Sequence, residues 1–237
     1  MNIALLFAGG RGDRMYTSKK PKQFIKVDGK PIIIHSIENF EKHSQIDKIC
    51  VVCIDSWIDK CREYIYQFGL KKVEWIVPGG ATGQQSIYNG LKAVSDNVGE
   101  KNNIVLISDG VRPIVSDNII TQCLECVKKY GSCVTVCPVP ETIVIINVQD
   151  EIIDIPKRND CYLSKAPQGF WLSEIMDAHR IANKENRFDC TNSAELIRRY
   201  GHSLHVIYDN EENIKVTNPI DIAIMKYILE RKSTNEF

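Results

Sequence analysis

The stretch that decides the fold is Leu6-Phe-Ala-Gly-Gly-Arg-Gly-Asp-Arg-Met15, followed after five residues by Pro21-Lys-Gln-Phe24. The apolar run Ile3 to Phe7 predicts a buried parallel strand that leads into it. Glycines at the end of a strand let the backbone approach a ligand and point several N–H groups at it, which suits phosphate. Arginines and lysines surround these glycines, so the stretch predicts a site for a polyphosphate. The alternative is a basic surface turn.

Two common phosphate-binding motifs do not describe this stretch. A Walker A loop requires Gly-Lys-Ser or Gly-Lys-Thr at a fixed spacing, and the stretch has neither. A dinucleotide fingerprint requires a third glycine three residues after Gly12, but Asp13, Arg14 and Met15 follow instead. The glycines therefore indicate a different kind of phosphate site.

The composition limits the class of protein. The chain has 237 residues, 43% of them hydrophobic, which is enough for one large domain or a domain with a small appendage. Its 30 basic and 30 acidic residues balance, so no overall positive field favours nucleic acid as a partner. No signal peptide is recognisable and no apolar run approaches 18 residues, so we expect a cytoplasmic protein without a membrane partner.

The nine cysteines are an odd number, which argues against a disulfide framework. Two pairs have C-x-x-C spacing, Cys50 with Cys53 and Cys123 with Cys126. Cys50 and Cys53 fall on a predicted strand, where side chains three apart face opposite sides and cannot share a metal ion. We interpret both pairs as small apolar packing residues.

Short β-branched runs alternate with longer helical patterns, which predicts an α/β fold: a Rossmann-like, doubly wound, mainly parallel sheet with helices on both faces. The expected strands are 3–7, 49–54, 73–77, 104–107, 133–138 and 204–207. The expected helices are 31–42, 57–69, 84–94, 117–130, 172–183, 191–200 and 218–231.

The alternation stops at residues 141–165. Thr142 to Ile146 and Glu151 to Ile155 read as two strands of a protruding β-hairpin, and their apolar positions need another surface to cover them. A β-excursion that packs on its own domain is the alternative to an arm that reaches a second subunit.

Five motifs in register resemble the methylerythritol-phosphate and ribitol-phosphate cytidylyltransferases, a family with a nucleotide-diphospho-sugar transferase-like fold. The glycine stretch with Pro21-Lys-Gln-Phe24 is the first of them. The others are Pro78-Gly-Gly80 with Ser86 to Leu91, Ser108-Asp-Gly-Val-Arg-Pro113, Ala166-Pro-Gln-Gly-Phe170 and Asn213-Ile-Lys-Val-Thr217. The resemblance covers about the whole chain, so residues 1–237 are expected to form one cytidylyltransferase domain. It also implies that residues 141–165 form the arm of a homodimer.

The resemblance implies a role for each of these positions. Arg14 and Lys22 would hold the triphosphate of CTP and stabilise charge at its α-phosphorus, and Lys215 would meet the α-phosphate from the other side, as catalysis of phosphoryl transfer requires. Asp109 would accept ribose hydroxyls or hold Mg²⁺, or another divalent cation, directly or through water. The remaining nucleotide-binding positions would be Ala8, Gly9, Gly10, Gly12, Gly80 and Ser86. The acceptor-binding positions would be Arg112, Thr142, Arg158 and Thr191.

Departures from the family pattern fall on the acceptor side. Asn192 and Ser193 stand where the methylerythritol-phosphate enzymes have acidic residues, which favours ribitol 5-phosphate or a similar polyol phosphate as the acceptor. The product would be a CDP-alditol for cell-surface polymers. Methylerythritol phosphate, a different nucleotide and a non-catalytic nucleotide-binding protein remain as alternatives. The five histidines fall on predicted helix or strand faces and are interpreted as structural.

Overall fold

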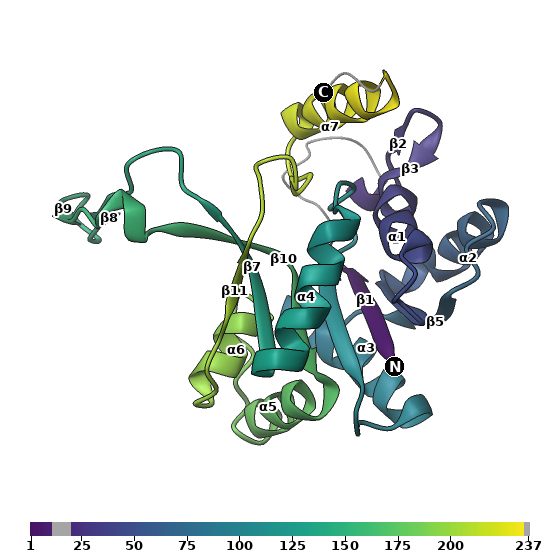
Figure 1. Ribbon diagram of the computed structural model, residues 1–237, viewed down its shortest axis with the longest axis horizontal. Helices are drawn as coiled ribbons and strands as arrows, with labels where there is room; N and C mark the ends of the chain where they lie inside the picture. The colour runs from purple at the N-terminus through teal and green to yellow at the C-terminus, as the bar shows by residue number, and fades with distance from the viewer. Residues whose placement is uncertain (11–19, 235–237) are drawn as a thin grey trace.

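The computed structural model, which describes residues 1–10 and 20–234, has a seven-stranded central sheet in the order β11-β7-β10-β6-β1-β4-β5 (Figure 1). Neighbouring strands are parallel except at β10, which is antiparallel to both β6 and β7. The strands are β1 (Asn2–Ala8), β4 (Lys48–Cys53), β5 (Val73–Pro78), β6 (Ile104–Asp109), β7 (Ser132–Pro138), β10 (Tyr162–Trp171) and β11 (Val206–Tyr208). The predicted α/β class with a mainly parallel sheet is confirmed.

Helices cover both faces of the sheet, as predicted for a doubly wound fold. The helices α1, α2 and α4 pack on one face, while α3, α5 and α6 pack on the other. Cys50 and Cys53 lie in these two different cores, which confirms that they face opposite sides of β4. The helices are α1 (Ile32–Lys42), α2 (Ile58–Gln67), α3 (Gly83–Val98), α4 (Asp117–Tyr130), α5 (Leu172–Lys184), α6 (Ser193–Arg199) and α7 (Pro219–Thr234).

Local capping fixes where α3 begins, next to the ends of β1 and β5. Thr82 accepts a hydrogen bond from the backbone N–H of Gln85, and the Gln85 side chain accepts one from the N–H of Thr82. This reciprocal capping box satisfies two N–H groups that would otherwise have no partner in the helix. The N-terminus of α3 is therefore held firmly beside the glycine stretch.

Strand β10 is the main element that the sequence analysis missed. It pairs with β6 through Gln168 to Trp171 and with β7 on its other side, with a register shift between Ser164 and Gln168. It begins at Tyr162, so the last residues of the predicted arm, 141–165, already belong to the central sheet. The final strand of the sheet also begins later than expected, at Val206 rather than Leu204.

A hairpin of β8 (Ile145–Ile146) and β9 (Ile152–Asp154) forms a separate two-stranded sheet that projects from the body of the molecule (Figure 1). Its strands are shorter than expected, because only these residues pair and Thr142 lies outside the ladder. The isoleucines of both strands are 45–62% exposed. Nothing in this chain covers them among the described residues.

Two smaller features complete the fold. The short strands β2 (Lys26–Val27) and β3 (Lys30–Pro31) join around Asp28 and Gly29, both with positive φ. Helix α7 packs near them through Met225, which shares a core with Val27 and with Val216 of the segment before the helix. Within the described residues, one-turn 3₁₀ helices lie at Lys22–Phe24, Asp55–Trp57 and Arg158–Asp160. Across residues 1–10 and 20–234, no helix is long and apolar enough to cross a membrane.

Candidate active site

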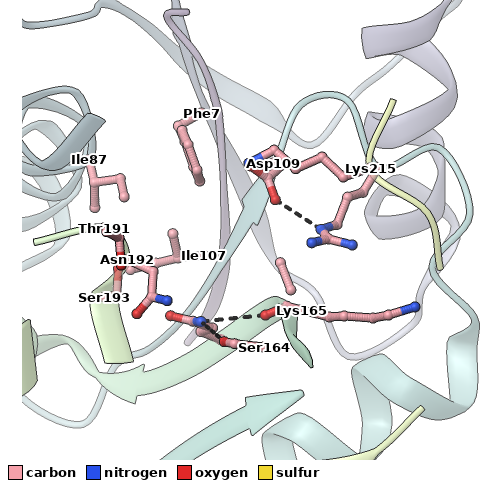
Figure 2. Close-up of a pocket in the computed structure, with 13 residues that line it drawn as sticks. Phe7, Ile87, Ile107, Asp109, Ser164, Lys165, Thr191, Asn192, Ser193 and Lys215 are labelled. Carbon is pink, nitrogen blue, oxygen red and sulfur yellow. Dashed lines mark hydrogen bonds and ion pairs between the residues drawn. The ribbon is translucent and has the colours of Figure 1, made fainter. Parts of the chain in front are cut away.

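Two adjoining cavities lie where β1 and β6 end. These strands run parallel with Phe7 opposite Asp109, so their carboxyl ends meet at one edge of the sheet, the usual ligand edge of an open α/β fold. The glycine-loop cavity, of about 130 Å³, is lined by Phe7, Ala8, Gly10, Lys22, Gln23, Asp109, Val111 and Lys215. The Thr191 cavity, of about 140 Å³, shares Phe7, Asp109 and Lys215 and continues to Thr191, Asn192 and Ser193 (Figure 2).

Two glycine turns pack against one serine beside the end of β1. The hydroxyl of Ser86 accepts a hydrogen bond from the N–H of Gly80 at 2.9 Å and donates to the carbonyl of Thr82 at 2.8 Å. A Cβ on Gly9 would lie 3.1 Å from the Ser86 Oγ, and one on Gly80 would lie 2.6 Å from the Gln85 Cβ. Glycine is therefore required at Gly80 for steric reasons. Nucleotide contact by Gly80 and Ser86 stays a prediction.

The Pro21-Lys-Gln-Phe24 motif is tied to the end of β1. The Nε2 of Gln23 donates to the carbonyls of Ala8 at 2.5 Å and Gly10 at 3.3 Å. Lys22, its neighbour, lines the glycine-loop cavity together with Gly10. The structure thus brings together Ala8, Gly9, Gly10 and Lys22. The predicted residues Gly12 and Arg14 lie outside the described part of the chain.

An ion cluster around the buried carboxylate of Asp109 stands between the two cavities. The Nε of Arg112 donates to one carboxylate oxygen of Asp109 at 2.9 Å, and the Nζ of Lys215 lies 2.6 Å from the other. Burial alone would raise the pKa of Asp109, but the charges and hydrogen bonds of Arg112 and Lys215 hold it below its ordinary value. Asp109 is therefore ionised at neutral pH, and it fixes the position of Lys215.

This arrangement bears on the predicted metal ligand. Both oxygens of Asp109 already face a cation, so a direct metal bond would have to displace Arg112 or Lys215. The described residues contain no group of three His, Cys, Asp or Glu side chains that could hold a metal ion. Asp109 therefore fits a direct ligand role poorly, and Mg²⁺ stays a prediction. Arg112 also donates to the carbonyl of Asn213 at 2.9 Å, so its predicted role in binding the acceptor now includes holding this segment.

The far wall of the Thr191 cavity is held by β10. The N–H and hydroxyl of Thr191 both donate to Glu195, each at 2.8 Å, and Asn192 caps α6 by accepting from the N–H of Glu195. The side-chain oxygen of Gln168 accepts from the N–H of Ala194 at 3.0 Å. The family motif that contains Gln168 thus positions the acceptor-side loop, which carries Thr191.

Lys165 is a pocket residue that the sequence analysis missed. Its Nζ donates to the carbonyls of Asn210 at 2.9 Å and Asn213 at 3.2 Å, and the residue is only 9% exposed. Burial, opposed in part by Cys137 and reinforced by the charge of Arg112, lowers the pKa of Lys165. The same Asn213 carbonyl accepts from Arg112, so the two cations hold the segment that carries Lys215. The signal in the sequence was a lysine directly before Ala166-Pro-Gln168.

Thr142 and Arg158 do not reach either cavity in this chain. Both lie on the projecting segment between β7 and β10, both are exposed, and neither lines a described cavity. Their predicted contact with an acceptor would therefore have to be made in another subunit. The predicted structural role of the histidines agrees with His35, which bonds the carbonyl of Val27, and His43, which bonds Thr121.

Known proteins are similar to this chain in sequence and in fold. A family model described as IspD, 2-C-methyl-D-erythritol 4-phosphate cytidylyltransferase, matches residues 2–231. A ribitol-5-phosphate cytidylyltransferase of Vibrio parahaemolyticus is 44% identical over 230 residues, covering 97% of this chain and 96% of its own. A 2-C-methyl-D-erythritol 4-phosphate cytidylyltransferase of Clostridium botulinum is 35% identical over 230 residues, covering 97% and 98%.

A solved structure gives the same fold. The 4-diphosphocytidyl-2C-methyl-D-erythritol synthase of Anaerococcus prevotii superposes with a TM-score of 0.82 at 24% identity, covering 97% of this chain and 96% of that one. At this identity the superposition speaks for the fold alone. The motifs, the fold and the nearly full-length matches agree, and the chain belongs to the IspD family of cytidylyltransferases.

Proposed function

We propose that this protein transfers CMP from CTP to an alditol phosphate and releases pyrophosphate. The acceptor that we favour is ribitol 5-phosphate. The observation that carries the proposal is the shared ion cluster of Asp109, Arg112 and Lys215. One cavity leads from it to the glycines and Lys22, as a triphosphate requires. The other leads to the polar Thr191 loop, as a hydroxylated acceptor requires. The product, a CDP-alditol, would serve as an activated precursor of cell-surface polymers.

The chemistry needs cations and backbone donors rather than a base. A phosphate oxygen of the acceptor attacks the α-phosphorus of CTP, a new P–O bond forms, and the bond to pyrophosphate breaks. Because the nucleophile is already an anion, catalysis consists of bringing two polyanions together and stabilising the added charge. Lys22 would hold the triphosphate, together with Arg14, and Lys215 would meet the α-phosphate between the two cavities.

The divalent cation is part of the same proposal. Mg²⁺ is commonly bound through substrate phosphates with few protein ligands. In this protein it would enter on the triphosphate of CTP, with Asp109 at most an indirect partner. We place the reaction in the cytoplasm, since nine cysteines without a disulfide framework suit a reducing compartment.

The choice of acceptor rests on the loop that closes the Thr191 cavity. Asn192 and Ser193 are neutral, and the 44% identical relative that is named for ribitol 5-phosphate supports a plain polyol phosphate. Methylerythritol 4-phosphate is the second candidate, because the matching family model and the Clostridium botulinum relative carry that name.

We also propose that the projecting segment makes the protein a homodimer. Ile146, Ile152 and Ile153 are 56–62% exposed on the hairpin, and exposed apolar surface of this kind marks an interface. A second copy would cover these side chains. Thr142 and Arg158 of one copy would then reach the Thr191 cavity of the other copy. Sedimentation analysis tests this step: the wild-type protein should be a dimer, and an Ile152→Asp, Ile153→Asp double variant should be a monomer.

Pyrophosphate release tests the function directly. Purified protein is incubated with CTP and Mg²⁺ and offered ribitol 5-phosphate, methylerythritol 4-phosphate or other polyol phosphates, one at a time. We expect turnover with ribitol 5-phosphate and a higher kcat/KM than with methylerythritol 4-phosphate. The reverse preference would place the protein with the second candidate, and no release with any acceptor would refute the proposal. UTP and ATP in place of CTP serve as nucleotide controls.

A further inference from the structure

A third, smaller cavity continues from the Thr191 cavity. It has a volume of about 30 Å³ and shares Phe7, Ile87 and the Thr191-Asn192-Ser193 loop with its neighbour. Its inner wall is formed by His179, Leu196 and Cys190, and we name it the His179 cavity. This space has roughly the size needed by an ordered water or a terminal CH₂OH group.

Two of its lining residues carry buried polar atoms that no described residue satisfies. The Ser193 hydroxyl and both ring nitrogens of His179 have no hydrogen-bond partner, and these residues are 3% and 1% exposed. Leaving such a group unsatisfied costs about 1–3 kcal/mol, so buried polar groups nearly always have partners. Both residues line this cavity, so a polar group that enters it would lie beside side chains whose polar atoms lack a partner among the described residues.

The protonation state of His179 fits this role. Burial lowers its pKa to about 4, so the ring is neutral at pH 7. A neutral imidazole offers one donor and one acceptor nitrogen that point in different directions, and a hydroxyl group can pair with either of them because it both donates and accepts. The titratable groups that face the ring are few: Tyr88 packs against it with ring centroids 5.7 Å apart, and Cys190 lines the same cavity.

The charge distribution sets the direction in which an acceptor would lie. Asp109 and Lys215 stand at one end of the Thr191 cavity, and the Thr191-Asn192-Ser193 loop stands at the other (Figure 2). Arg112 is bonded to Asp109 and so belongs to the first of these ends. The dianionic phosphate belongs at the cationic end. The carbon chain then points past Ser193, and its last hydroxyl reaches the His179 cavity.

We propose that the His179 cavity selects the acceptor by the hydroxyl at the end farthest from its phosphate, with His179 and Ser193 as the hydrogen-bond partners. This inference rests on the proposed function and deepens it, because it names the part of the acceptor that the protein recognises. A site that is built to bond a hydroxyl rejects an analogue without it, since the buried polar groups are then left unpaired.

The test compares ribitol 5-phosphate with its analogue that lacks the hydroxyl on C1. In the wild-type protein we expect kcat/KM to be at least about tenfold higher for ribitol 5-phosphate, as the loss of a buried hydrogen bond implies. His179→Leu and Ser193→Ala should each lower kcat/KM for ribitol 5-phosphate several-fold and leave that for the analogue unchanged. The KM for CTP should stay the same in all variants.

His205→Leu is the matched control. His205 also has a buried nitrogen without a partner, but it stacks on Tyr130 at 4.1 Å, away from the three cavities. This variant should keep the wild-type preference. If His179→Leu fails to fold in a thermal melt, Ser193→Ala carries the test, since it removes a single oxygen.

Equal losses for both acceptors, or an unchanged preference in the variants, would overturn the inference and leave the cavity as a structural water site. Failure of the proposed function is a separate result, because the wild-type protein would then release no pyrophosphate with any polyol phosphate. That result would remove the basis of the inference as well.

Discussion

The two main cavities of the site are built in different ways. The glycine-loop cavity takes most of its wall from residues close in the sequence, Ala8 to Gly10 and Lys22 with Gln23. The Thr191 cavity takes its wall from segments far apart in the chain, among them β6, β10 and the loop before α6. The difference teaches that one short motif can encode most of the wall of a cavity, here the one that we propose for the triphosphate. Recognition of a small hydroxylated acceptor needs several elements to come together.

The largest expected effect concerns the ion cluster that the two cavities share. Asp109→Asn leaves the buried charge of Arg112 without its counter-charge and removes the partner of the more exposed Lys215, which should lower the free energy of unfolding by about 3–5 kcal/mol. Urea denaturation measures it. Asp59→Asn is the control, because it breaks an exposed pair with Arg62 and should cost less than about 1 kcal/mol. Equal stability of the two variants would show that the ion cluster does not stabilise the fold.

The next effect concerns the glycine-loop cavity alone. Lys22→Ala should leave the fold intact and lower kcat about 10²–10³-fold, since it removes a preorganised cation at the triphosphate. Steady-state pyrophosphate release measures kcat, and circular dichroism checks the fold. Lys26→Ala, an exposed lysine four residues away, should behave like the wild-type protein. Near-normal turnover in Lys22→Ala would refute the proposed mechanism.

A smaller effect tests how the Thr191 cavity, which several distant segments form, depends on Lys165 of β10. Lys165→Met removes the ammonium group that bonds the carbonyls of Asn210 and Asn213, which should cost about 1–3 kcal/mol of stability. Because this segment carries Lys215, kcat should fall more than the KM for CTP rises. Lys42→Met, at a well-exposed position, should change stability by less than about 0.5 kcal/mol. A loss confined to stability, with kcat unchanged, would contradict the positioning role.

The smallest effect concerns the projecting segment. Arg158→Ala should raise the KM for the acceptor about tenfold, because one charge-assisted hydrogen bond of about 1.5 kcal/mol is lost. The KM for CTP should not change, and Arg62→Ala on α2 should leave both values unchanged. Initial rates at varied concentrations of each substrate measure the two KM values. A selective loss of CTP binding would contradict the proposed role of the arm.

Much of the fold could be predicted because short runs of neighbouring residues encode most of its strands. The runs at Ile3 to Phe7 and Ile104 to Ile107 are apolar and β-branched, and the structure confirms them as β1 and β6. Strand β10 contains Ser164, Lys165, Pro167 and Gly169, which do not read as a strand, and it forms because β6 and β7 flank it with open edges. The predicted hairpin was right in kind but too long, since its ladder holds few residues.

The sequence alone determined the family and the doubly wound sheet, and it predicted a phosphate site at the glycines, because each is carried by neighbouring residues whose spacing is visible in the chain. Only the tertiary structure showed that Asp109 is held by Arg112 and Lys215 and that Lys165 is buried beside them. It also placed His179 and Ser193 in one cavity. These residues lie on different elements, and the packing of the helices against the sheet, rather than any local pattern, brings them together.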